Sequence, residues 1–282
     1  RSRSPLGCAG RQRESEIGQT CARRDKDLRK ETRMTEAYAN KEPAVPQREM
    51  VIAAHPDDIE YLAGGTVAKW VRAGSVVRYV MVSTGDAGIY GPGMTREKAA
   101  RIRESEQRSA AKVIGVERVV FLWYHDGEVE PTLKLRRELV REIRLFKPDT
   151  VICFDPTHVY FRGYINHPDH RAVGQASLDA VTPLPFCPLV FAGSEELRGK
   201  ALEPHHVKDV LVMFPLDPNT WIDISDTIDL KIESLRQHVS QFPDGQKVER
   251  TLREMGARNG ADMDISYVEP FRRIVLEPLD DS

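Results

Sequence analysis

Short apolar segments alternate with helix-like segments from Met50 onward, and this alternation limits the fold more than any other feature. Apolar runs typical of buried strands occupy residues 50–54, 76–82, 119–122 and 150–154, with later runs at 210–214 and 221–224. Helical spacing with caps and stop signals predicts helices at residues 62–73, 95–114, 133–146, 169–180 and 228–239. Strands joined by helical crossovers form parallel sheets. We therefore expect a Rossmann-like α/β fold, a mostly parallel sheet with helices on both faces, in a single domain.

The N-terminal segment differs in composition from the rest of the chain. Residues 1–33 contain no aromatic residue and few apolar ones, so they bury too little surface to offset the entropy of ordering. We expect this segment to be disordered, or to be an added extension with Met34 as the natural start. A basic targeting arm is the alternative. Residues 34–282 are then the functional domain.

Composition excludes several classes of partner. The formal net charge is −2 and the positive charge is concentrated in residues 1–33, so the body is mildly acidic and nucleic acid is not the expected partner. No apolar run approaches the ~18–20 residues that a membrane span needs. Only Cys153 and Cys187 lie outside the N-terminal segment, which indicates a reducing compartment rather than a disulfide framework. We expect a cytoplasmic protein that forms a homo-oligomer.

Metal-binding residue types follow the first expected strand. His55, Asp57 and Asp58 lie in the sequence His-Pro-Asp-Asp directly beyond it. Ligands of open α/β sheets bind beyond the carboxyl ends of the strands. Histidine and aspartate are both good zinc ligands. Taken alone, a His-Pro-Asp sequence is more often a turn that bonds its own backbone.

A second group of the same kind follows the fourth expected strand. The sequence Asn-His-Pro-Asp-His supplies His167, Asp169 and His170 at the start of the next helix. Because parallel strands end at one edge of the sheet, the two groups can converge on one point. Three protein ligands with a fourth position left for water is the arrangement of catalytic zinc. Together the two groups therefore predict a metal site, with the surplus side chains left for acid and base roles.

These two motifs resemble those of the LmbE/PIG-L family of zinc-dependent N-acetylglucosaminyl deacetylases. The resemblance spans roughly residues 48–245, and it includes Gly64-Gly65-Thr66, Arg103, Glu106, Ala110-Ala111, Asp126-Gly127 and His238-Val239-Ser240-Gln241. One departure is Ile59, which separates Asp58 from Glu60, whereas the family usually has a glutamate directly after the second aspartate. The departure concerns local packing, because that position is not a metal ligand in the family.

The resemblance implies a role for each residue of the site. His55, Asp58 and His170 would hold zinc, and Fe²⁺ is the alternative ion because two histidines with one carboxylate also suit it. Asp57 would be the general base. As an imidazolium, His167 would stabilise the oxyanion, and Asp169 would orient a histidine. Weaker expectations are that Arg103 and Asp126 contact substrate hydroxyls; the alternative for Arg103 is a charge on the helix surface. The His238 side chain could extend to the mouth of the pocket or have a structural role, and the two alternatives are equal.

The expected reaction is removal of an acetyl group from a small N-acetylated substrate, most simply an N-acetylglucosamine conjugate. An N-acyl cysteine conjugate is a second substrate class. Phosphoryl chemistry on Mg²⁺ or Mn²⁺ and a non-catalytic sugar- or metal-binding module are the competing functions, and two histidine ligands disfavour Mg²⁺. The glycine-rich loop at residues 83–94 lacks the dinucleotide-binding pattern, so no organic cofactor is expected. Aromatic residues near the same sheet edge could pack on a sugar: Trp123, Tyr124, Tyr160, Phe161 and Tyr164.

Overall fold

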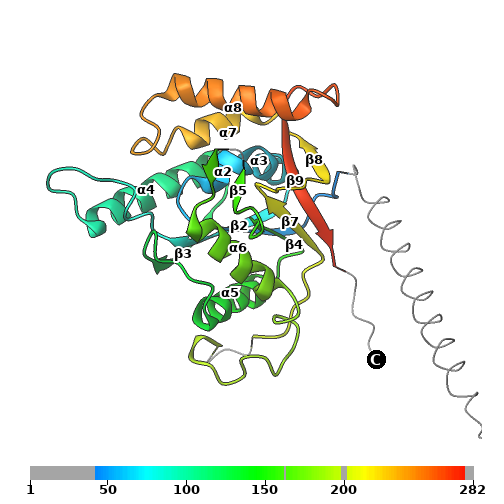
Figure 1. The fold of residues 1–282 in the computed structure, drawn as a ribbon. Coiled ribbons are helices and arrows are strands. Elements are labelled where there is room, and N and C mark those ends of the chain that lie inside the picture. The colour runs from blue at the N-terminus through cyan, green and yellow to red at the C-terminus, as the bar shows by residue number, and fades with distance from the viewer. Residues whose placement is uncertain (1–41, 162, 198–201, 277–282) are drawn as a thin grey trace, which may run out of the picture. The chain divides into compact units, whose positions relative to one another are not determined.

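A seven-stranded sheet forms the centre of the part of the chain that the computed structural model describes, residues 42–161, 163–197 and 202–276 (Figure 1). Residues 1–33, for which disorder or an added extension was expected, lie outside the described residues. The strand order is β3-β2-β1-β4-β7-β9-β8. The strands are β1 (Arg48–Ala53), β2 (Val76–Ser83), β3 (Arg118–Tyr124), β4 (Thr150–Phe154), β7 (Asp209–Met213), β8 (Thr220–Asp223) and β9 (Val268–Val275).

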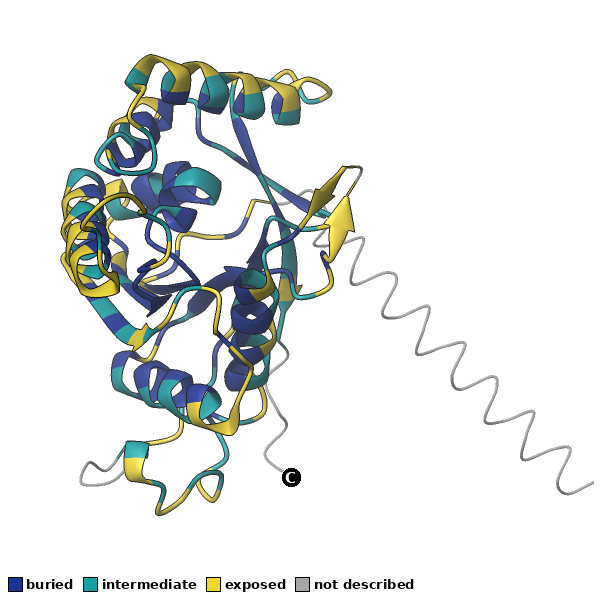
Figure 2. Cartoon of the chain, turned by 60° about the vertical axis from the view of Figure 1, so that its left-hand side comes forward, coloured by how far each residue is buried: buried dark blue, intermediate teal, exposed yellow. Residues whose placement is uncertain are grey.

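The first five strands in this order, from β3 to β7, pair in parallel. Strand β9 lies between β7 and β8 and runs antiparallel to both, and β8 forms this edge of the sheet. The central strand β1 is buried from Glu49 to Ala53, which explains its nearly continuous apolar sequence (Figure 2). The expected mostly parallel α/β sheet is therefore confirmed.

Helices cover both faces of the sheet. On one face lie α5 (Leu133–Phe146) and α6 (Pro168–Val181), which contact each other and the central strands (Figure 1). On the other lie α2 (Asp58–Leu62), α3 (Gly64–Arg72), α4 (Arg96–Ile114) and α7 (Ile228–Leu235), with α8 (Gly245–Gly260) packed on α7. The expected caps are present, since the Thr95 side chain accepts a hydrogen bond from the Lys98 N–H and Gly115 ends α4 with a φ of 97°.

Six features of the fold differ from the sequence expectations or were not anticipated. The helix expected at 62–73 is preceded by the separate short helix α2, and the helix expected at 228–239 already ends at Leu235. The connection between β4 and α6 contains a hairpin of β5 (Tyr160–Phe161) and β6 (Tyr164–Ile165), and a 3₁₀ turn, η1, covers Glu195–Leu197. Helix α8 and strand β9 were not predicted. Strand β9 contains Pro270, Arg272 and Arg273, so its sequence lacks the apolar run or alternation that marks a strand.

Helix α6 approaches β4 closely enough to require a glycine. A Cβ atom on Gly174 would lie 2.6 Å from the Phe154 carbonyl oxygen and 3.0 Å from the Pro156 nitrogen, both of them backbone atoms. We expect Gly174→Ala to lower the free energy of unfolding by about 1–3 kcal/mol, despite the better helix propensity of alanine. Denaturant unfolding beside Gln175→Ala, on the exposed side of the same helix, measures this. Equal stability of the two variants would contradict the close approach.

Candidate metal centre and active site

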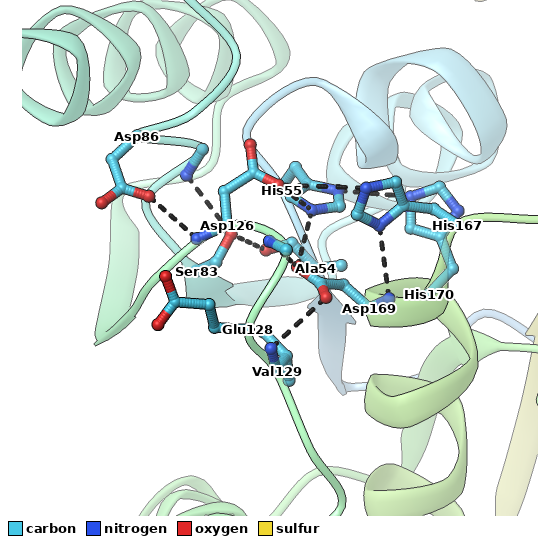
Figure 3. A network of polar contacts seen from close by, with 12 residues as sticks. Ala54, His55, Ser83, Asp86, Asp126, Glu128, Val129, His167, Asp169 and His170 are labelled. Carbon is cyan, nitrogen blue, oxygen red and sulfur yellow. Dashed lines mark hydrogen bonds and ion pairs between the residues drawn. The ribbon is translucent and has the colours of Figure 1, made fainter. Parts of the chain in front are cut away.

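The two His-Pro-Asp segments meet at the carboxyl edge of the parallel strands. The first leaves β1 and enters α2, and its turn is held by a hydrogen bond from the His55 N–H to Asp58 Oδ2 of 2.8 Å. The second forms the start of α6, where His167 is the N-cap and Pro168 the first helical residue. The edge expected to bind a ligand is therefore the one at which these side chains gather (Figure 3).

Three residues in this cluster have donor atoms at the spacing of metal ligands. His55 Nδ1 lies 3.3 Å from His170 Nε2, and Asp58 places its two oxygens 3.6 Å from His55 Nδ1 and 3.2 Å from His170 Nε2. Ligand atoms at about 2.1 Å from a tetrahedral zinc ion lie roughly 3.4 Å from one another. The geometry of His55, Asp58 and His170 thus fits one small cation.

Hydrogen bonds on the far side of each ring decide which nitrogen carries a lone pair. His55 Nε2 lies 3.2 Å from carboxylate oxygens of both Asp126 and Asp169, so it carries the proton and Nδ1 is free to bind a metal. His170 Nδ1 lies 3.0 Å from Asn166 Oδ1, which leaves Nε2 with its lone pair. Two lone pairs and the Asp58 carboxylate therefore converge on one point, an arrangement that a cation satisfies.

The charges around the cluster agree with this assignment. Burial lowers the pKa of His55, but the carboxylates of Asp126, Asp169 and Asp58 outweigh burial and raise that pKa well above its usual value. Burial raises the pKa of Asp58, but His170 and His55 outweigh burial. The pKa of Asp58 is therefore lowered below its usual value, and the carboxyl is ionised. The surroundings of the site thus stabilise positive charge at this point.

A second possible ligand group shares His55 with the first. It consists of His55, Asp126 and His167, with Asp126 Oδ1 3.2 Å from His55 Nε2 and 4.0 Å from His167 Nε2. Because His55 Nε2 donates its proton to carboxylates, it has no lone pair for a second ion. Asp126, like Asp169, is therefore a hydrogen-bond partner of His55, and His167 lies beside the His55 ring. Asp169 is fixed in this role, since it is buried and also accepts bonds from the Gly127 and Val129 N–H groups (Figure 3).

The expected base, Asp57, lies beside the metal ligands and against Arg103. Arg103 Nη2 is 3.1 Å from Asp57 Oδ2 and also donates to the Pro56 carbonyl. Burial raises the pKa of Asp57 to about 6; Arg103 opposes this shift, and neighbouring Asp58 adds to it. Arg103 is 3% exposed, so the alternative that it is a surface charge is wrong.

His167 lies half-exposed on the other side of His55, with a ring-to-ring distance of 4.7 Å. Its Nδ1 accepts a bond from the Asp169 N–H, so its Nε2 can carry a proton toward the site. Burial, and then the nearby His55, lower the pKa of His167. The neutral ring is thus favoured over the imidazolium expected from the sequence, and it still has an N–H to donate.

A hollow of about 450 Å³ opens beside these residues. Asp57, Asp58 and His170 form its polar part. The rest is lined by Tyr61, Leu62, Tyr164, Phe214 and Phe242. Of the aromatic residues expected to face a substrate, only Tyr164 lines it among the residues described here. Tyr61, Phe214 and Phe242 were not anticipated: Tyr61 and Phe242 each directly follow a segment noted in the sequence, and Phe214 ends an expected strand.

Several polar residues of the site were missed in the sequence. Gln107 contacts both Asp57 and Glu60, and it could have been noticed because it follows Arg103 by one helical turn. Asp86 accepts bonds from the Asp126 N–H and from His125, and no local pattern marks it. His238 is fully buried and contacts Glu60 at 3.3 Å, which supports its structural reading and not a place at the pocket mouth.

A two-histidine, one-carboxylate centre beside a partly buried carboxylate, at the carboxyl edge of a parallel sheet, defines a metal-dependent hydrolase. Among the described residues, no helix has the length and apolar character to cross a membrane.

Comparisons with known proteins identify the family. The family model described as PIG-L, GlcNAc-PI de-N-acetylase, matches residues 50–181. Diacetylchitobiose deacetylase of Thermococcus kodakarensis is 33% identical over 196 residues, which cover 69% of this chain and 70% of that protein. A probable N-acetyl-alpha-D-glucosaminyl L-malate deacetylase 2 of Bacillus anthracis is 30% identical over 204 residues, 68% of this chain and 80% of that protein.

A solved structure agrees with these sequence matches. N,N'-diacetylchitobiose deacetylase from Pyrococcus horikoshii superposes with a TM-score of 0.73 at 29% identity, covering 84% of this chain and 88% of that one. The chain therefore belongs to the PIG-L (LmbE) family of N-deacetylases. The resemblance found in the sequence is confirmed.

Proposed function

We propose that this protein is a zinc-dependent N-deacetylase that hydrolyses the acetamide of a small N-acetylglucosamine conjugate. The observation that carries the proposal is the convergence of His55, Asp58 and His170 donor atoms beside the partly buried carboxylate of Asp57. Relatives in sequence are named as a diacetylchitobiose deacetylase and a probable N-acetyl-alpha-D-glucosaminyl L-malate deacetylase. A cytoplasmic location and a homo-oligomer remain predictions from the sequence.

His55, Asp58 and His170 would hold the ion. When bound, zinc lowers the pKa of a coordinated water to about 7 and polarises a carbonyl oxygen. Asp126 and Asp169 keep His55 in the tautomer that presents Nδ1, and Asn166 does the same for His170 Nε2. Fe²⁺ suits the same donors and is the alternative ion.

Asp57 would move the proton. With a pKa of about 6, its carboxylate is mostly ionised at neutral pH and close enough in pKa to give the proton back. Taking a proton from the attacking water and delivering it to the leaving amine completes the hydrolysis. Arg103 holds the carboxylate ionised and fixes its direction.

His167 would donate a hydrogen bond from its Nε2–H to the oxyanion that forms from the acetyl carbonyl. The carbonyl oxygen develops negative charge only toward the transition state, so a fixed N–H donor beside it speeds the chemical step. We expect His167→Ala to lower kcat by about 10²–10³-fold while KM and zinc content stay near those of the wild type. Steady-state kinetics with zinc analysis tests this. A normal kcat with a raised KM would assign His167 to substrate binding instead.

The aromatic hollow would bind the sugar. Tyr61 and Phe242 stack with an interplanar angle of 12°, and Tyr164 and Phe214 lie in the same hollow. Flat apolar faces beside polar groups are the usual composition of small-molecule sites. Specificity for one N-acetylglucosamine conjugate would depend on these side chains.

Acetate release from a panel of N-acetylated compounds tests the proposed substrate class. The panel contains N-acetylglucosamine, N,N'-diacetylchitobiose, other N-acetylglucosamine conjugates and N-acetylcysteine conjugates. We expect release from the sugar conjugates. Release from the cysteine conjugates alone would replace the sugar with that second class, and phosphatase activity that depends on Mg²⁺ without any acetate release would overturn the proposal.

A further inference from the structure

Asp57 has a backbone conformation that residues other than glycine rarely adopt. Its φ is 101° and its ψ is −26°, in the left-handed region. Such a conformation costs free energy and persists only where the surrounding structure fixes it. Although Asp57 is the N-cap residue of α2, its side chain makes no capping hydrogen bond there. Contacts other than a capping bond therefore hold this conformation, and bonds within the turn, such as that from the Tyr61 N–H to the Asp57 carbonyl, are one part of them.

Helix α4 supplies further contacts from two residues on one face. Gln107 Oε1 accepts a hydrogen bond of 3.0 Å from the Asp57 N–H. One turn earlier, Arg103 bonds the Asp57 carboxylate and the preceding carbonyl of Pro56. Gln107 is fully buried, so no water replaces its bond to the Asp57 N–H. The backbone of Asp57 is thus held by Gln107 and its carboxylate by Arg103.

A second pair of residues fixes which end of the Gln107 amide faces Asp57. Gln107 Nε2 donates to Glu60 Oε1 at 2.8 Å, and Glu60 Oε2 lies 3.3 Å from His238 Nε2. A carboxylate can only accept hydrogen bonds, so the NH₂ group of the Gln107 amide must face Glu60. The oxygen of the same amide must then face the Asp57 N–H. Glu60 and His238 are both fully buried. The Asp57 N–H therefore donates to Gln107, and Gln107 and His238 both donate to Glu60, so the donor and the acceptor of each contact are fixed.

We propose that Gln107 is a positioning residue for Asp57, and that Glu60 and His238 set the orientation of its amide. The inference rests on the proposed role of Asp57 as the base. The hydrogen bonds of Gln107 go to Asp57 and Glu60, and Gln107 is not itself among the residues that line the hollow, so its effect on the reaction passes through Asp57.

Gln107→Met tests the inference, because methionine keeps the volume and removes both hydrogen bonds. We expect kcat to fall by about 10²-fold, the effect of a displacement of about 1 Å in a reacting group. KM and the zinc content at saturating zinc should stay at wild-type values. Gln175→Met, an exposed glutamine on α6, is the matched control and should leave kcat unchanged. A wild-type kcat in Gln107→Met, or recovery of its kcat by excess zinc, would overturn the inference.

Exchanging the carboxylate and the amide between positions 60 and 107 separates a positioning role of Gln107 from a role in packing alone. In Gln107→Glu two carboxylates would face each other across the 2.8 Å contact, so we expect a loss of kcat like that of Gln107→Met. In the double variant Glu60→Gln with Gln107→Glu, the amide at position 60 donates to the new carboxylate, which still accepts from the Asp57 N–H. We expect the double variant to recover most of the lost kcat. A double variant no better than Gln107→Glu would contradict the inference, even if Gln107→Met fails to fold.

The two proposals fail in different ways. A folded, zinc-loaded wild type that releases no acetate from the panel would refute the proposed function. An active wild type with an equally active Gln107→Met would refute the positioning role alone.

Discussion

Replacing the Asp57 carboxylate by an amide of the same shape should abolish most turnover and spare the metal. We expect Asp57→Asn to lower kcat by about 10²–10⁴-fold, the usual contribution of a general acid or base. Asparagine cannot take a proton from water, whereas His55, Asp58 and His170 are untouched and should still bind one zinc per chain. Kinetics at saturating substrate, with zinc measured on the same sample, gives both quantities.

The stability of Asp57→Asn must be measured beside its kinetics. Arg103 is buried against Asp57, so the substitution leaves a guanidinium without its charge partner and should also lower the free energy of unfolding. Asp217→Asn, at an exposed aspartate, is the matched control. A folded Asp57→Asn protein with near-normal kcat would show that another group is the base.

Removing a metal ligand should have the other large effect. His170→Ala deletes one of three donors and also the ring stacked on Phe154 at a centroid distance of 4.2 Å. We expect zinc affinity to fall by more than about 10²-fold, since loss of outer hydrogen-bond partners alone costs about 10–100-fold. Activity should fall with the bound zinc. Competition with a zinc chelator, with His206→Ala as a matched histidine control, measures this loss; wild-type zinc affinity in His170→Ala would refute the assigned ligand set.

The residues of the metal centre could be predicted because each lies in a short local motif. His55 and Asp58 are in one turn, and His167, Asp169 and His170 are in another, each directly after a strand or at the start of a helix. The alternation of strands and helices then placed both motifs at one edge of the sheet. Local sequence was sufficient because the site is built where parallel strands end.

The supporting residues could not be predicted because their roles depend on packing between distant segments. Gln107 reaches Asp57 across 50 positions, and His238 reaches Glu60 across 178. Arg103 appears in the sequence as a charged helix residue, and only the packing of α4 against the turn shows that it is buried beside Asp57. Strand β9 escaped prediction for a similar reason, because its pairing with β7 and β8 determines its structure more than its own sequence does.

The most direct test of the whole account is a zinc titration of metal-stripped protein, with acetate release from an N-acetylglucosamine conjugate as the readout. The account predicts no release without metal, and a rate that rises linearly until one zinc per chain is bound and then levels off. Acetate release that is independent of metal, or no release from folded protein with one zinc bound per chain, would contradict it.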